Sequence, residues 1–186
     1  NFALNYDSLA TIDDTSCRYQ MTYVPDDNFE NYLEANGMGD GIYLNDSVYT
    51  HNINLVQSLT QLDGLNIADL TGIEDFTNLT QLYVYNNNLS SLDVSQNTAL
   101  NELYVYNNNL SSLDVSSLDS LTRLLCKNNQ LTSLDVSTNT ALVSLVCEYN
   151  QLTSLDVSNN TALTTITCND NQLTSLDVSQ NIYLSE

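Results

Sequence analysis

The most regular feature of the chain is a pattern of apolar positions that repeats every 21 residues. Between successive marker leucines, each unit follows the pattern L-x-x-L-x-[VC]-x-x-N-x-L-x-x-L-D-V-S. A fixed period of this length is the signature of a solenoid, in which one unit cannot bury its apolar face alone. We therefore expect stacked coils with a continuous core. The marker positions are Leu79, Leu100, Leu121, Leu142, Leu163 and Leu184.

The first part of each unit alternates apolar and polar residues, which is typical of a half-buried strand. In the stretch LYVYN, Leu103 and Val105 are expected to point inward, and Tyr104 and Tyr106 outward. Strands of successive units should then lie about 4.8 Å apart in a parallel sheet. The motif SLDVS that follows is expected to return as an extended segment along the opposite wall.

Two further residue types are locked to the same period. An asparagine follows each strand, where its amide can satisfy backbone groups that a turn leaves unpaired. Cysteines occupy one inward strand position in three units, where stacked thiols behave as small buried hydrophobes. The asparagines are Asn87, Asn108, Asn129, Asn150 and Asn171, and the cysteines are Cys126, Cys147 and Cys168. Cys17 lies outside the array, and its redox state is not assigned.

The period decays toward the N-terminus. Residues 79–186 hold five 21-residue repeats and the start of a sixth, and residues 53–78 read as a degenerate first repeat. In residues 23–52, Pro25 and an Asp pair precede an amphipathic segment that ends near Gly37, which predicts a helix. We interpret residues 23–52 as a helical N-terminal cap and residues 1–22 as an extended leader.

These motifs resemble bacterial internalin-type leucine-rich repeat proteins, especially those with 21-residue repeats and a cysteine ladder. The residues that carry the likeness are the LTSLDVSxNTAL arrays and the YVPDDNFExYLEANGxGDG start. The resemblance implies an α/β repeat solenoid, with a right-handed coil, a parallel β-sheet on one face and a helical N-terminal cap. It also implies a non-catalytic role in adhesion or recognition. Val84 and Val105 stand where the ladder would have cysteine, so the thiol column is partial.

Composition narrows the classes of function. The 186 residues include 23 acidic and three basic side chains, for a formal net charge of −20. Such a surface repels phosphate backbones and anionic lipid surfaces, so nucleic-acid binding is not expected. No apolar run approaches the roughly 20 residues needed to span a bilayer, so membrane insertion is not expected either. The scarcity of lysine and arginine beside abundant Asn, Ser, Thr and Tyr favours an extracellular protein, secreted or at the bacterial cell surface. No cofactor is indicated.

The acidic residues offer two candidate metal sites, each with a simpler interpretation. The SLDVS motif gives a column of aspartates, which calcium could bridge, but calcium takes six to eight oxygen ligands and the flanking residues are Leu, Val and Ser. We therefore favour a solvated or locally hydrogen-bonded wall. In the loop NGMGDGIYLNDS, the residues Asp40, Asn45 and Asp46 are candidate metal ligands. We favour the simpler interpretation, in which this loop is a plain turn between the cap and the first coil. The column comprises Asp93, Asp114, Asp135, Asp156 and Asp177.

Catalysis has little support in the sequence. His51 is the single histidine, and the repeated acids form a column instead of a converging pair. The ladder cysteines are expected to point into the core, where reactive thiol chemistry is not expected. We therefore expect no enzymatic activity.

Outward strand positions are the better candidates for binding. Aromatic side chains are enriched at interfaces and stack on sugars, although cross-strand tyrosine pairs also stabilise a sheet without any partner. The candidate face consists of Gln81, Tyr83, Tyr85, Glu102, Tyr104, Tyr106, Arg123, Lys127 and Glu148.

The leading hypothesis is a secreted or cell-surface module that binds a protein or a glycan through this face. One alternative is a subunit of an extracellular filament, in which copies of the chain assemble end to end through an uncapped C-terminal coil and the leader. A weaker alternative is a targeting module of a larger secreted enzyme. Asp-Ser-apolar triplets also resemble an O-glycosylation signal of some secreted bacterial proteins, at Ser8, Ser47 and Ser120 and less closely at Thr15.

Overall fold

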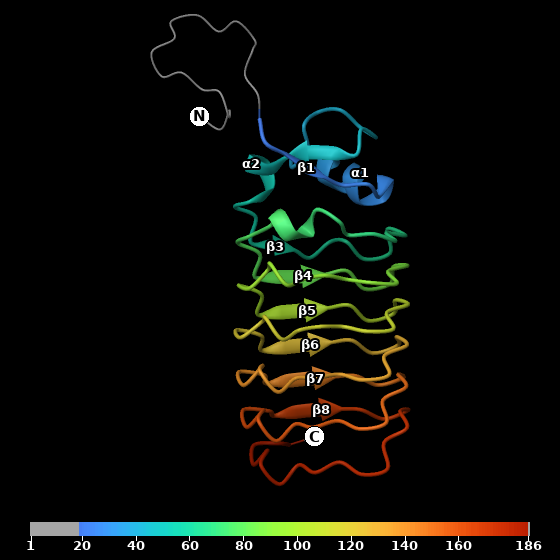
Figure 1. Ribbon diagram of the computed structural model, residues 1–186, viewed down its shortest axis with the longest axis vertical. Helices are drawn as coiled ribbons and strands as arrows, with labels where there is room; N and C mark the ends of the chain where they lie inside the picture. The colour runs from blue at the N-terminus through green and yellow to red at the C-terminus, as the bar shows by residue number, and fades with distance from the viewer. Residues whose placement is uncertain (1–18, 186) are drawn as a thin grey trace, which may run out of the picture.

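The computed structural model describes residues 19–185, which form a stack of coils with a small helix-and-hairpin unit at one end (Figure 1). The coils share one parallel sheet, whose strands follow each other in chain order. These strands are β3 (Ser58–Leu59), β4 (Gln81–Tyr83), β5 (Glu102–Tyr104), β6 (Arg123–Leu125), β7 (Ser144–Val146) and β8 (Thr165–Thr167). The predicted leucine-rich repeat solenoid with a parallel sheet on one face is confirmed.

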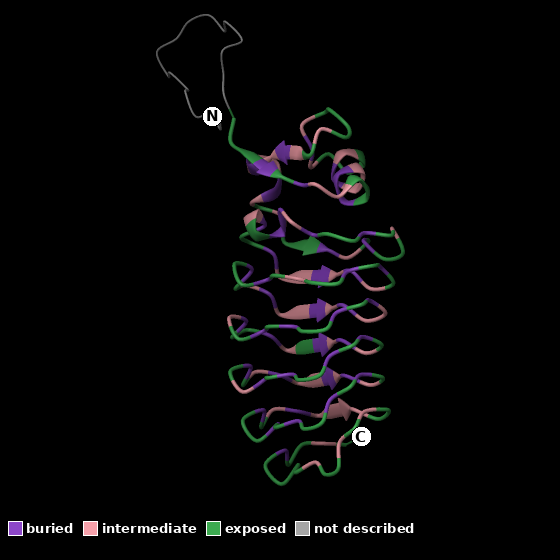
Figure 2. Cartoon of the chain, turned by 45° about the vertical axis from the view of Figure 1, so that its right-hand side comes forward, coloured by how far each residue is buried: buried purple, intermediate pink, exposed green. Residues whose placement is uncertain are grey.

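The register of the sheet equals the sequence period. Leu82 pairs with Leu103, and Leu103 pairs with Leu124, so each residue lies beside its counterpart in the next coil. Leu103 and Val105 are fully buried, while Tyr104 and Tyr106 are half-buried on the outer face, as the alternation predicts. Figure 2 shows buried segments along the inside of the coils from β3 to β7, whereas β8 is half-buried and the coil after it is mostly exposed. The coils therefore share one continuous apolar core.

The wall opposite the sheet is extended chain broken by turns, without further strands in the described residues. Leu113 and Val115 of the second SLDVS motif point into the core, and Asp114 between them is exposed. One short 3-10 helix, η1 (Ile73–Asp75), interrupts this wall in the first coil.

The asparagine after each strand joins two coils. The amide nitrogen of Asn129 donates to the carbonyls of Val105 and Cys126, both at 3.0 Å, so it bonds to the previous coil and to its own. Its amide oxygen accepts from the backbone N–H of Leu110 at 3.0 Å. Three buried backbone groups are thus satisfied by one side chain. Asn87, Asn108, Asn150 and Asn171 make the equivalent bonds.

A second asparagine column lies at the other corner of the coil, and the sequence analysis missed it. The amide nitrogen of Asn139 donates to the carbonyls of Val115 and Leu118, both at 2.9 Å. The column is interrupted once, where Leu118 is buried at the equivalent position. Its other members are Asn97, Asn160 and Asn181.

The N-terminal unit packs on the first coil. It consists of β1 (Met21–Tyr23), α1 (Asp27–Ala35), β2 (Ser47–Tyr49) and α2 (Thr50–Ile53), with β1 and β2 antiparallel. One carboxylate oxygen of Asp26 caps α1 and the other accepts from the N–H of Ala68 in the first coil. Phe29 packs against Phe76, with ring centroids 6.2 Å apart. The helix forms where the sequence predicts it and ends before Gly37, whose φ is +72°. In the described part of the chain, neither helix has the length and apolarity to cross a bilayer.

Replacing Asn129 with alanine should lower the free energy of unfolding by about 3 kcal/mol, because three buried backbone groups lose their partner. The neighbouring Asn109→Ala is the matched control, since Asn109 is exposed and keeps its backbone bond to Leu89. Urea denaturation followed by circular dichroism measures both variants. Equal losses would contradict a special role for the buried column.

Candidate interaction surface

The outward side chains of β4 to β7 and of the residues just after them form one surface, here called the strand face. Two tyrosine pairs stack across neighbouring strands on it. Tyr83 and Tyr104 have ring centroids 4.0 Å apart and planes within 5°. Tyr85 and Tyr106 lie 4.4 Å apart with planes within 7°. Because the rings of each pair are stacked, one face of each ring is covered by the other ring.

Charged residues hold the tyrosines in place. The Tyr83 hydroxyl donates to a Glu102 carboxylate oxygen, and the other Glu102 oxygen lies 3.7 Å from an Arg123 guanidinium nitrogen. Burial, followed by this bond to Glu102, raises the pKa of Tyr83 well above its ordinary value. The ammonium group of Lys127 lies 5.5 Å from the centroid of the Tyr106 ring. The tyrosine side chains of the strand face are therefore held by contacts within the chain.

All nine residues predicted for the binding face lie on the strand face. Gln81 begins β4 and accepts a hydrogen bond from the Ser58 hydroxyl at 3.2 Å, and Glu148 follows β7. Both cations of the described residues, Arg123 and Lys127, lie here, in a chain that is otherwise strongly acidic. The strand face thus differs in charge from the rest of the described molecule.

One exposed aromatic residue near this surface was missed by the sequence analysis. Tyr149 directly follows Glu148, is 53% exposed, and has a left-handed backbone with φ of 52°. The signal was present in the sequence, because Asn86, Asn107 and Asn128 occupy the same place in the preceding units.

The aspartate column of the opposite wall is used by local turns. A carboxylate oxygen of Asp135 accepts from the backbone N–H of Ser137 at 2.9 Å. Bonds from the Ser137 hydroxyl and N–H lower the pKa of Asp135, which is exposed. The same turn and the same direction of pKa shift recur at the other aspartates. These are Asp93, Asp114, Asp156 and Asp177.

The loop that offered a second metal candidate is fastened by buried and half-buried carboxylates. The Asn45 amide nitrogen donates to Asp40 at 3.0 Å. Glu30, which is fully buried, accepts from the backbone N–H groups of Asn45 and Asp46 at 2.9 and 3.1 Å. Among the described acids, the oxygens that gather within 4.8 Å belong to Asp27, Glu30 and Asp46, a set that includes one of the three predicted residues. The Glu30 carboxylate therefore holds the loop by accepting hydrogen bonds from the loop backbone.

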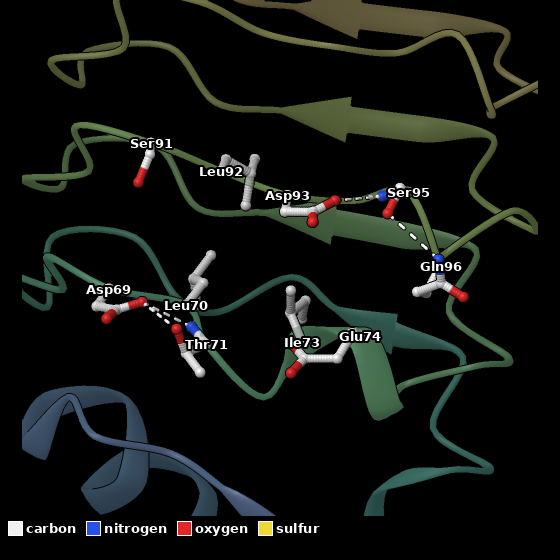
Figure 3. A pocket seen from close by; sticks show the side chains of 10 residues that line it. All are labelled: Asp69, Leu70, Thr71, Ile73, Glu74, Ser91, Leu92, Asp93, Ser95 and Gln96. Carbon is white, nitrogen blue, oxygen red and sulfur yellow. Dashed lines mark hydrogen bonds between the residues drawn. The ribbon is translucent and has the colours of Figure 1, made fainter.

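A cleft of about 350 Å³ lies on the wall opposite the sheet, between η1 and the coil of β4 (Figure 3). Its acidic lining residues are Asp69, Glu74 and Asp93. Each accepts a hydrogen bond from a backbone N–H within two residues, at 2.8 or 2.9 Å. The lining contains no histidine, cysteine or cation. These carboxylates shape turns.

The ladder cysteines lie inside the coils as free thiols. Cys126 and Cys147 are fully buried, and Cys168 is half-buried. Burial, together with the neighbouring Cys168 and Glu148, raises the pKa of Cys147 to about 12. Burial likewise raises the pKa of Cys126 well above its ordinary value. These groups are neutral thiols at physiological pH, which makes them poor nucleophiles.

The serines of the glycosylation triplets differ in accessibility. Ser120 is exposed at a corner of the coil, whereas Ser47 lies half-buried in β2 and its hydroxyl donates to Asn45 at 3.2 Å. Ser8 and Thr15 lie outside the described residues, as do Cys17 and most of the proposed leader.

Known proteins with similar sequences and folds are leucine-rich repeat proteins. The chain is 42% identical over 78 residues to Internalin J of Listeria monocytogenes serotype 4b (strain F2365), which is 41% of this chain and 8% of that protein. No protein-family model matches the chain. It superimposes on the functional domain of InlJ from Listeria monocytogenes, described as including a cysteine ladder, with a TM-score of 0.59 and 32% identity over 90% of this chain and 47% of that one.

Two further solved structures share the fold. One is the leucine-rich repeat protein LIC12759 of Leptospira interrogans, with a TM-score of 0.62 and 25% identity over 72% of this chain and 36% of that one. The other is the internalin InlF of Listeria monocytogenes strain 4b F2365, with a TM-score of 0.74, 23% identity, and coverage of 88% and 48%. This last likeness concerns the fold alone. The chain spans less than half the length of each of these proteins.

Alkylation of the folded protein with iodoacetamide at mildly alkaline pH should modify Cys168 well before Cys147 and Cys126. The two fully buried residues combine the least access with a raised pKa, and both should react fully once urea unfolds the chain. Peptide mapping by mass spectrometry distinguishes the sites. Rapid labelling of Cys126 in the folded chain would contradict its burial.

Stability should depend on the ionisation of the aspartate wall. The pKa of Asp135 is lowered in the fold from its ordinary 3.8, so its stabilising contribution is complete above that pH and is lost as the pH falls through the lower folded value. Wild type should therefore be more stable than Asp135→Ala at neutral pH. The difference in urea midpoint should shrink as the pH falls below 3.8. A difference that stays constant with pH would contradict this origin.

Proposed function

We propose that this chain, an internalin-like leucine-rich repeat protein with a cysteine ladder, is an extracellular, non-enzymatic module that binds a partner through its strand face. The observation that carries the proposal is the pair of tyrosine stacks, Tyr83–Tyr104 and Tyr85–Tyr106, held on a rigid sheet beside the two cations of the described chain. Aromatic residues and arginine are the side chains most enriched at binding hot spots.

Preorganisation supports this assignment. Tyr83 is fixed by Glu102 and by its neighbour Tyr104, so little conformational entropy remains to be lost when a partner binds. A rigid aromatic side chain also offers large contact area for few rotatable bonds. A sheet that needed only stability could obtain it from cross-strand packing of any β-branched or aromatic residue.

The geometry favours a protein over a glycan. Sugars stack on the flat face of an aromatic ring, and in both tyrosine pairs one face of each ring is covered by the other ring. Lys127 lies over the Tyr106 ring as well. Ring edges and hydroxyl groups suit the mixed apolar and hydrogen-bonding contacts of a protein interface. We therefore infer that the partner is a protein.

The proposal is tested by replacing tyrosines on the strand face. Tyr104→Ala and Tyr106→Ala should each lower the affinity for a bound peptide by about tenfold or more, since each removes a stacked tyrosine ring. Binders are selected from a phage-displayed library of random peptides on the wild-type protein, and affinities are measured by fluorescence polarisation. A glycan array, probed in parallel, should give no signal that depends on these residues.

The matched control is Tyr43→Ala, which removes an exposed tyrosine from the loop between α1 and β2. It should leave affinity unchanged. Selected peptides that bind Tyr104→Ala and Tyr106→Ala as tightly as wild type would refute the strand face as the binding site, and glycan binding lost in both variants would refute the choice of a protein.

A further inference from the structure

The chain leaves each strand through one residue with left-handed backbone. This residue is asparagine in the first three regular coils, then Tyr149, then Asp170. Their φ angles lie between 52° and 56°. Asparagine and aspartate adopt this conformation several times more readily than other non-glycine residues, whereas a bulky side chain there is an outlier. Tyr149 is thus the single member of the column that the local backbone disfavours.

The asparagines of this column also bond to each other. The amide nitrogen of Asn107 donates to the amide oxygen of Asn86 at 2.5 Å, and that of Asn128 donates to Asn107 at 2.6 Å. An asparagine at position 149 would extend the same chain of amides. Tyr149 forgoes both this bond and the backbone preference. Such a locally unfavourable choice points to a requirement other than folding.

The surroundings of Tyr149 define what it can bind. The residue is 53% exposed, and it follows Glu148, which belongs to the strand face. Asp170 occupies the same position in the next coil, and its negative charge, followed by a hydrogen bond between the two side chains, raises the pKa of Tyr149, with smaller contributions from burial and from Glu148. An exposed aromatic ring beside two carboxylates is chemically suited to a cationic side chain, through ring-face attraction and charge-assisted hydrogen bonds.

The charges of the strand face agree with a cationic partner. Arg123 is already paired with Glu102, and Lys127 already lies over Tyr106. The cations of the surface therefore have partners within the chain, while the net charge of −20 attracts basic proteins and speeds their association.

We propose that Tyr149, Glu148 and Asp170 extend the strand face around the turn and bind a lysine or arginine side chain of a basic protein partner. This inference rests on the proposed function, because it assigns an additional anchor and a charge to the same partner. The inference predicts that replacing Tyr149 with asparagine has opposite effects on stability and on binding. Asparagine stabilises the turn, whereas tyrosine binds the partner.

Tyr149→Asn should raise the thermal midpoint by about 2 to 4 °C, because asparagine suits the turn and continues the amide chain. The same variant should weaken binding of the selected peptides about tenfold. Tyr149→Phe retains the ring and should stay within about twofold of wild type. A merely structural tyrosine would not show higher stability together with weaker binding.

Charge is tested separately with a matched pair of variants. Asp170→Asn should weaken binding, whereas Asp135→Asn on the opposite wall changes the net charge equally and should not. The probes are peptides selected on wild type from the random phage-displayed library, and their sequences should be enriched in lysine or arginine. Their affinity should fall as salt is raised.

The outcomes separate this inference from the proposed function. Tyr104→Ala could weaken peptide binding while Tyr149→Asn and Asp170→Asn do not. In that case the turn is not part of the binding site, and the proposal that the strand face binds the partner still stands. If the selected peptides are not basic, or if Asp135→Asn weakens them equally, the proposed charge of the partner is wrong. Failure to select any binder, or binding unaffected by all these variants, would refute both proposals.

Discussion

No regular coil of the described chain can provide hydrogen-bond partners for all the backbone groups of its own turns. After each strand the backbone leaves carbonyl and N–H groups inside the molecule, and the bridging asparagine, such as Asn129, bonds to two coils at once. A buried backbone group without a partner costs free energy comparable to a lost hydrogen bond. The asparagine therefore fixes how successive coils superimpose. The leucine and cysteine columns and the in-register sheet follow from that superposition.

Superposition also determines what the surface can look like. Each outward residue lies beside its counterpart one period away, so like side chains stack in columns unless the sequence changes. Stacking is favourable for tyrosine rings and unfavourable for carboxylates, whose repulsion on the opposite wall is reduced by water and by the serine turns. Residues with a specific function are then expected where the side chain differs from its counterparts in the neighbouring coils. Arg123, Lys127 and Tyr149 are departures of this kind.

The parts of the fold that repeat could be predicted from the sequence, because every copy reports the same geometry. The inward Leu103 and Val105, the outward Tyr104 and the exposed Asp114 all follow from alternation and period. Contacts that occur once could not be predicted. The burial of Glu30 depends on how one loop folds back on α1, and the pairing of Tyr83 with Glu102 depends on side-chain rotamers. The second asparagine column was visible as the Asn of NTA, but its role depends on a corner geometry that the pattern alone does not give.

The direction of the sheet hydrogen bonds has a mechanical consequence. They run from coil to coil, along the long axis of the stack (Figure 1), so a pull between the two ends acts directly on them. Under tension the coils would detach one after another, and each 21-residue unit would release about 70 Å of extended chain. A tether that lengthens in such steps limits the peak force on whatever it holds.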